Sequence, residues 1–162
     1  MRHGETVDNA RQVMQGQTPG QLNANGIRQA ELVRDRLQTE HIDAFVSSDL
    51  KRSLDTCRII ALPHGKSITT TPLLRERDWG SFTGRYIPDL KDAPWTDDIE
   101  TLEAMKQRAR KFLEMVKENY PGQTVLAVGH GIINKAVQSV YYGRPMNEIE
   151  KMQNAEVRTL LL

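Results

Sequence analysis

The sequence has a single cysteine, Cys57, a formal net charge of only +1 and no long apolar run. One cysteine excludes an internal disulfide and a metal site built from several cysteines. The 22 Lys and Arg nearly balance the 21 Asp and Glu, and the two signs are interspersed, which argues against broad attraction to nucleic acid or to a membrane surface. No apolar run approaches the roughly 20 residues that cross a bilayer, and the start lacks a signal-peptide pattern. We therefore expect a soluble, cytoplasmic protein.

Histidine is also scarce: the chain has four, and two of them stand beside glycine near opposite ends of the chain. His3 lies in Arg2-His3-Gly4-Glu5, and His130 lies in Gly129-His130-Gly131. Glycine costs conformational entropy and packs poorly, so it suits turns in which backbone N–H groups approach a ligand. These turns favour a site for phosphate or carboxylate. Taken singly, His3 is as well explained by a surface histidine near a chain end, and His130 by a histidine that caps a strand-to-helix turn.

The apolar pattern predicts one α/β domain over residues 1–162. Predicted helices are 23–40 with Asn23 as N-cap, 51–62, 100–119 and 131–142; predicted strands are 42–48, 68–71, 124–128 and 157–162; residues 80–98 form a loop. Strands that alternate with helices indicate a three-layer αβα sandwich with a mostly parallel sheet.

Ligands in such folds lie beyond the C-terminal ends of the strands. Ser47-Ser48 and Gly129-His130 both follow predicted strands, which places them at one edge of the sheet. Arg2-His3 has no strand before it. For His3 to share that edge we expect a leading strand supplied by native residues before Met1, because a site residue on a frayed terminus would be poorly positioned.

Four stretches occur in order along the chain: Arg2-His3-Gly4-Glu5-Thr6, Ser47-Ser48-Asp49-Leu50-Lys51-Arg52, Leu74-Arg75-Glu76 leading to Gly80, and Val128-Gly129-His130-Gly131. In residue type and order they resemble the histidine phosphatase superfamily, also known as the phosphoglycerate mutase-like family. The resemblance covers nearly the whole chain and extends to Asn9, Gln15-Gly16 and Leu22-Asn23. It implies a phosphoglycerate mutase-like fold and catalysis through a phosphohistidine.

Phosphoryl transfer explains the choice of residues. The transferred group carries charge on three oxygens, and planar arginine forks suit that charge, so Arg2 and Arg52 are candidate ligands, with His130 and Asn9 as further donors. Taken alone, Arg52 would more simply be a solvated residue of its helix. The nucleophile must be a neutral imidazole, and the resemblance gives that role to His3. Nearby arginines would lower the pKa of His3, since like charge disfavours the imidazolium.

The departing oxygen needs a proton, and one carboxyl group can act first as acid and then as base. The resemblance assigns this role to Glu76, and Asp78 is the rival candidate. Gln15, Gly16 and Gly131 complete the expected substrate-binding residues. Trp79 and Trp95 are expected to pack in a lid or core rather than to stack on substrate.

The resulting hypothesis is a phosphomonoesterase that needs no metal or cofactor and acts on a small phosphorylated metabolite. In the resembled family, glycolytic mutases carry a longer insertion after the position of Gly84, which favours a phosphatase here; Thr83, where many relatives have an acidic residue, is a departure. Two alternatives remain open: a phosphoglycerate mutase using the same site, and a non-catalytic domain that binds phosphorylated ligands. The oligomeric state is open, with a homodimer as one option.

Overall fold

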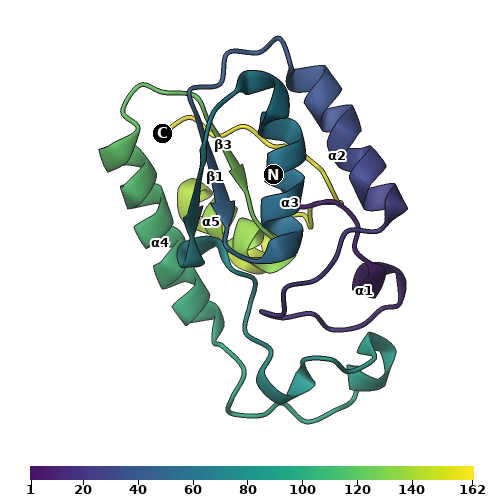
Figure 1. Cartoon of the computed structure of the whole chain (residues 1–162). Coiled ribbons are helices and arrows are strands. Elements are labelled where there is room, and N and C mark those ends of the chain that lie inside the picture. The colour runs from purple at the N-terminus through teal and green to yellow at the C-terminus, as the bar shows by residue number, and fades with distance from the viewer.

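A computed structural model describes residues 1–162 (Figure 1). The helices and strands are α1 (Val7–Ala10), α2 (Ala24–Leu37), β1 (Ala44–Ser48), α3 (Lys51–Ala61), β2 (Ile68–Thr71), α4 (Leu102–Asn119), β3 (Val125–Val128) and α5 (Gly131–Tyr142). Strands and helices alternate from β1 onward, which confirms the predicted α/β class. None of the helices has the length and apolar composition needed to cross a membrane.

The three strands form a parallel sheet in the order β2-β1-β3. The chain start continues this sheet beside β3. Arg2 bridges Gly129 in parallel, and the His3 N–H donates to the Gly129 carbonyl at 3.1 Å. On its other side, the Ala155 N–H donates to the His3 carbonyl at 3.0 Å. His3 therefore reaches the same sheet edge as His130, and the expected leading strand stays a prediction.

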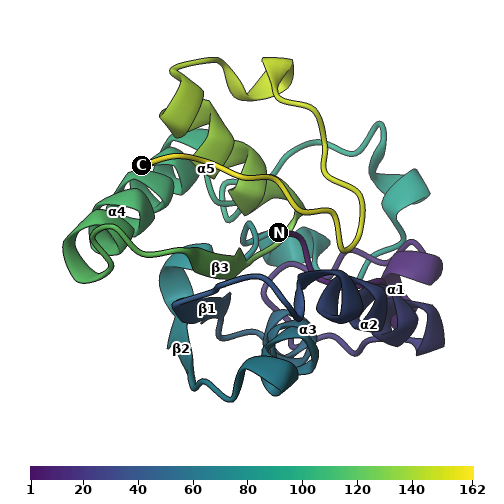
Figure 2. The same ribbon diagram turned by 90° about the horizontal axis from the view of Figure 1, so that it is seen from above.

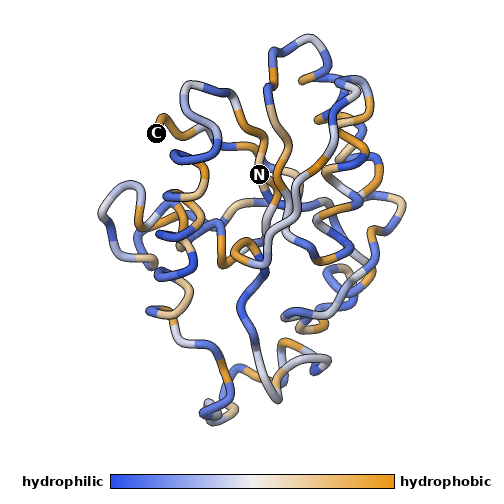
Figure 3. Tube along the Cα trace, turned by 60° about the vertical axis from the view of Figure 1, so that its left-hand side comes forward, coloured by the Kyte–Doolittle hydropathy of each residue, from blue (hydrophilic) through white to orange (hydrophobic).

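Helices cover both faces of the sheet, which confirms the predicted three layers. Viewed from above, α2 and α3 lie on one face and α4 and α5 on the other (Figure 2). Side chains alternate between the faces along a strand: Phe45 packs toward Cys57 of α3, and Val46 packs toward Met105 of α4 and Ile133 of α5. Hydrophobic residues accordingly gather along the central strands (Figure 3). Apolar side chains thus fill the space between the sheet and the helices on both faces.

Most predicted boundaries hold, but the predicted strand at 157–162 is wrong. Asn23 caps α2 as expected, since its Oδ1 accepts a hydrogen bond from the Gly26 N–H at 2.8 Å. The last six residues instead run as an irregular segment, and the Leu161 N–H donates to the Tyr141 hydroxyl at 3.1 Å. A strand needs a paired neighbour, and in this region only Ala155 and Glu156 pair with the chain start.

The 80–98 loop contains short 3-10 turns and a small apolar cluster of its own, formed by Phe82, Leu90 and Ile99. Its base is held by Arg77, whose guanidinium carbon lies 4.7 Å from the Trp79 ring centre and 4.9 Å from that of Trp95. Cations stack favourably on indole faces. Trp79 is half-buried and Trp95 is 62% exposed, so both indoles contact Arg77 while their packing in a lid or core stays a prediction.

Candidate active site

The two glycine-flanked histidines meet at the C-terminal edge of the sheet. His3 follows the Met1–Arg2 segment and His130 follows β3, and their ring centroids lie 5.1 Å apart in an edge-to-face arrangement. Both side chains are buried, with 2% and 0% of their surface exposed. Parallel strands thus bring together residues that are 127 positions apart in the sequence.

The His3 ring is held in one tautomer. Its Nδ1 lies 2.6 Å from the Gly4 carbonyl oxygen. A carbonyl only accepts, so Nδ1 carries the ring proton and Nε2 keeps its lone pair. Burial, with the nearby charge of Arg52 and then of Arg2, lowers the pKa of His3 to about 3 against the opposing effect of the Gly4 hydrogen bond. The ring is neutral at physiological pH.

Gly4 serves a purpose other than the expected one. The sequence suggested that its N–H approaches an anion, but that N–H donates to the Thr56 hydroxyl at 3.1 Å. A Cβ on Gly4 would lie only 2.5 Å from the Gly26 carbonyl oxygen, and one on Gly26 would lie 1.9 Å from the Glu5 carbonyl oxygen. The two glycines therefore let the loop after His3 pack directly on the first turn of α2.

Two arginines flank the histidines. Arg52, in the first turn of α3, is 1% exposed, and its Nη2 donates to the Gly16 carbonyl at 2.8 Å. The Nη1 of Arg2 donates to the Met152 carbonyl at 2.8 Å. In both side chains Nε is buried without a hydrogen-bond partner. Burial lowers the pKa of Arg52 to about 10, so the guanidinium stays charged at neutral pH.

His130 adds a third unpartnered buried nitrogen. Its Nε2 lies 2.9 Å from the Ser48 hydroxyl, which already accepts from the Leu50 N–H at 3.2 Å. A hydroxyl oxygen has two lone pairs, so Ser48 can either donate its hydrogen to Nε2 or accept a hydrogen bond from it; when Ser48 donates, the ring proton is on Nδ1. That Nδ1 has no partner. Burial, together with the charge of Arg52, lowers the pKa of His130 well below its usual value.

Glu76 reaches the same edge from the segment after β2. Its Oε1 accepts from the N–H groups of Ile132 and Ile133, each at 3.1 Å, and from that of Arg77 at 3.0 Å. A helix N-terminus offers free N–H groups and a positive dipole end, so it holds a carboxylate well. A Cβ on Gly131 would lie 3.6 Å from Glu76 Oε2 and 3.7 Å from the Arg2 Cζ, which shows that both groups converge on this residue.

The other predicted site residues have structural partners. The Asn9 Oδ1 accepts from the Thr6 N–H at 3.1 Å, and the Gln15 Oε1 accepts from the Thr6 hydroxyl at 2.9 Å. Asp78 is exposed, and its Oδ1 accepts from the Gly80 N–H at 2.9 Å. The structure therefore places Glu76, rather than Asp78, in contact with α5 beside the histidines.

Sequence reasoning missed the contribution of the C-terminal segment. The Nδ2 of Asn154 donates to the His3 carbonyl at 3.2 Å and to the Asn9 Oδ1 at 3.3 Å. It thereby ties the segment that carries His3 to α1, which carries Asn9. Nothing near Asn154 in the sequence, which reads Gln153-Asn154-Ala155, distinguishes it from an ordinary turn.

The buried histidines predict acid-sensitive stability. Both titrate near pH 6.5 when unfolded, and the folded pKa of His3 is about 3. Between these values the unfolded chain binds more protons than the folded chain, so the free energy of unfolding falls as pH falls from 6.5 toward 3. Each histidine contributes a slope of up to about 1.4 kcal/mol per pH unit. Urea unfolding from pH 7 to pH 4.5 in a phosphate-free buffer measures this slope.

His130→Asn is expected to flatten that pH dependence. The matched control is His41→Asn, because the His41 side chain is 82% exposed. Equal slopes in the wild type and in both variants would contradict the assignment of His130 as a neutral buried ring.

Comparisons with known proteins show which family the sequence matches. Residues 1–162 match the sequence model of the Histidine phosphatase superfamily (branch 1). A Yersinia enterocolitica protein named "Probable phosphoglycerate mutase GpmB" is 33% identical over 159 residues, which cover 90% of this chain and 74% of that protein.

Solved structures share the fold. A mycobacterial glucosyl-3-phosphoglycerate phosphatase in complex with VO3 superposes with a TM-score of 0.88 at 25% identity, covering 95% of this chain and 87% of that one. The alpha-ribazole phosphatase of Shigella flexneri gives a TM-score of 0.86 at 25% identity, covering 96% and 85%. The similarity in both cases spans nearly the whole chain.

Proposed function

The chain belongs to the histidine phosphatase superfamily, branch 1, and from this premise we propose that it is a metal-independent phosphomonoesterase acting through a phosphohistidine on His3. Arg2, Arg52 and His130 bind the phosphoryl group, and Glu76 is the general acid and base. The substrate is a small phosphorylated metabolite.

One observation carries the proposal. Three buried nitrogens, Arg2 Nε, Arg52 Nε and His130 Nδ1, have no hydrogen-bond partner, and all three belong to side chains that surround His3. Buried donors are nearly always satisfied, and leaving one unpaired costs about 1–3 kcal/mol. With the His130 ring proton on Nδ1, a tetrahedral anion would accept hydrogen bonds from all three nitrogens at once, and its charge matches the two guanidinium groups.

The chemistry proceeds in two displacements. The lone pair on His3 Nε2 attacks phosphorus in line with the ester oxygen; the N–P bond forms, the P–O bond breaks, and the departing oxygen takes a proton from the Glu76 carboxyl group. Water then attacks the phosphohistidine, gives its proton to the Glu76 carboxylate, and releases inorganic phosphate and neutral His3. The arginines stabilise the charge on the equatorial oxygens in both steps.

A phosphoglycerate mutase is the second candidate. It is favoured by the name of the Yersinia relative, whereas two similar solved structures carry phosphatase names. A mutase returns the phosphoryl group from His3 to a second hydroxyl, and a phosphatase transfers it to water. The short connection between Gly84 and Glu100 supports the phosphatase.

Two assays separate the candidates. The phosphatase is expected to release phosphate from p-nitrophenyl phosphate and glycerol 2-phosphate in excess EDTA. A mutase would convert 3-phosphoglycerate to 2-phosphoglycerate, dependent on a bisphosphate primer, with little release of phosphate. Absence of any turnover, with retained binding of vanadate, would support a non-catalytic binding domain and overturn the proposal.

Glu76→Gln is expected to lower kcat/KM for glycerol 2-phosphate by about 10²-fold, a loss typical of a general acid. Its effect on kcat/KM for p-nitrophenyl phosphate should be much smaller, because kcat/KM reports the first displacement and nitrophenolate departs without a proton; kcat should fall on both substrates, since Glu76 also acts as base in the hydrolysis of the phosphohistidine. Asp78→Asn is the matched control. If Asp78→Asn gave the substrate-selective loss and Glu76→Gln did not, the roles of the two carboxyl groups would be exchanged.

A further inference from the structure

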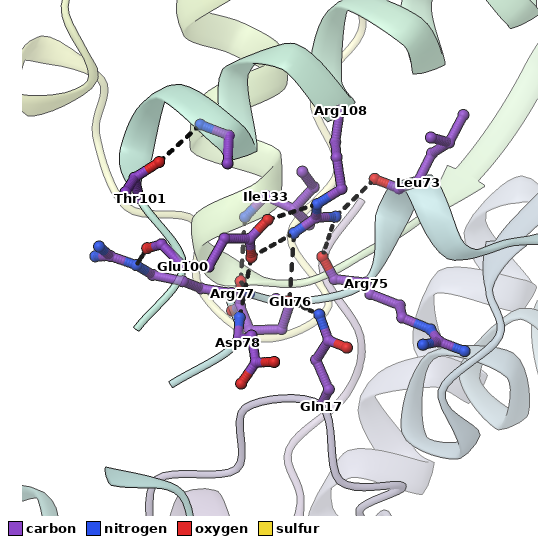
Figure 4. A network of polar contacts seen from close by, with 11 residues as sticks. Gln17, Leu73, Arg75, Glu76, Arg77, Asp78, Glu100, Thr101, Arg108 and Ile133 are labelled. Carbon is purple, nitrogen blue, oxygen red and sulfur yellow. Dashed lines mark hydrogen bonds and ion pairs between the residues drawn. The ribbon is translucent and has the colours of Figure 1, made fainter. Parts of the chain in front are cut away.

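A second polar network adjoins the main chain of Glu76. Arg108 extends from α4 toward the segment that joins β2 to Glu76 (Figure 4). Its Nη1 donates to the carbonyls of Leu73 at 3.0 Å and of Arg75 at 2.9 Å, and its Nη2 lies 3.5 Å from the Glu76 carbonyl. One guanidinium therefore contacts three carbonyl oxygens within the four residues 73–76.

Glu100 holds that guanidinium in place. Its Oε1 and Oε2 accept from Arg108 Nε at 2.8 Å and from Nη2 at 2.9 Å. The two side chains are only 20% and 14% exposed, so this forked pair is shielded from water and has the geometry of a strong ion pair. Glu100 also accepts from the Asp78 N–H at 3.0 Å, and its carbonyl accepts from Arg77 Nε at 2.7 Å.

Glu76 is thus fixed from two directions. Its carboxylate is held by N–H groups at the start of α5, and its main chain is held by Arg108 and by Gln17, whose Nε2 donates to the Glu76 carbonyl at 3.2 Å. After the 3-10 turn at Pro72–Leu74, residues 75–79 have no regular secondary structure. A carboxyl group that must reach a leaving oxygen tolerates little displacement, and an error of about 1 Å can cost about 10²-fold in rate.

We propose that Arg108, locked by Glu100, is a positioning residue that sets the placement of the Glu76 carboxyl group for proton transfer to the leaving oxygen. The inference rests on the proposed function. The hydrogen bonds of Arg108 go to Glu100 and to the carbonyls of residues 73–76, so it acts through the main chain at Glu76. The same pair holds the backbone N–H of Asp78 and the side chain of Arg77, so it fixes the base of the 80–98 loop together with Glu76.

The test is the dependence of rate on the leaving group. Arg108→Met is expected to lower kcat/KM for glycerol 2-phosphate by about 10- to 100-fold while changing kcat/KM for p-nitrophenyl phosphate by less than about threefold, because kcat/KM reports the first displacement and nitrophenolate departs unprotonated. In a Glu76→Gln background Arg108→Met should add almost nothing, since the two residues act on one step.

Arg110→Met is the matched control, because Arg110 lies on the same helix with a 48% exposed side chain paired to Glu103. It should leave both rates unchanged. Glu100→Gln is close in size to the native side chain and serves if Arg108→Met folds poorly; it should show the same selective loss in milder form. Arg108→Lys should restore part of the rate on glycerol 2-phosphate.

Three outcomes are distinct. The first is an equal loss of kcat/KM on the two substrates in Arg108→Met and Glu100→Gln, accompanied by lower thermal stability. It would mean that the pair has only a structural role, and it would overturn the inference. Full additivity with Glu76→Gln would also overturn it. If the wild type hydrolyses neither substrate, the proposed function fails, and the variants are not needed to show it.

Discussion

His3→Ala is expected to lower kcat for p-nitrophenyl phosphate by on the order of 10⁵- to 10⁶-fold, a loss comparable to that of a covalent nucleophile in other enzymes. The imidazole is neutral, fixed by Gly4 and close to the charges of Arg52 and Arg2, and its unprotonated Nε2 carries the lone pair that a nucleophile needs. The two arginines and His130 would still bind the substrate, so its Kd should change far less than kcat.

A covalent adduct provides the direct measurement. Wild type quenched during turnover of a labelled aryl phosphate should carry an acid-labile, base-stable phosphoryl group on His3, and His3→Ala should carry none. His41→Ala is the control, because it removes an exposed imidazole outside the site. A fully active His3→Ala variant, or a phosphoryl group on another residue, would rule out His3 as the nucleophile.

The local sequence pattern was sufficient to predict the positions of the site residues that come after strands. His130 comes directly after a nearly continuous apolar strand and directly before a helix that begins at Gly131, as predicted. Arg52 comes two residues into a helix that follows β1. Parallel strands end at a common edge, so fold class and residue position together placed these side chains near each other.

Contacts between distant segments could not be predicted in this way. Arg108 lies in a helix whose sequence shows only an ordinary alternation of charged and apolar residues, and its partners Leu73 and Arg75 are more than 30 positions away. Gly4 was expected to face an anion because glycine permits close approach. Close approach is indeed its role, but to the Gly26 backbone, since a glycine by itself does not reveal its neighbour.

The predicted strand at 157–162 failed for a related reason. Its β-branched and apolar composition favours extended backbone, yet a strand is defined by a paired neighbour. Asn154, a few residues earlier, instead contacts the chain start through its side chain. Segments at the end of the chain thus contribute to the site through individual contacts, which no periodic pattern records.

Arg52→Ala is expected to lower kcat by about 10²- to 10³-fold, the usual consequence of removing one donor that stabilises a developing charge. The guanidinium is 1% exposed, lies close enough to both histidines to lower their pKa values, and keeps Nε free of protein partners. Arg52→Lys should recover only part of this loss, because an ammonium is a point charge and lacks the planar fork.

Lys51→Ala is the matched control for Arg52→Ala, because it removes a neighbouring cation in the same helical turn. The Lys51 side chain is 57% exposed and pairs with Asp55, so its loss should change kcat by less than about twofold, as expected for an exposed ion pair. Combining His3→Ala with Arg52→Ala should cost little more than His3→Ala alone, since residues that act on one step are not additive. Equal losses in Lys51→Ala and Arg52→Ala would mean that general positive charge, rather than a placed guanidinium, binds the phosphoryl group.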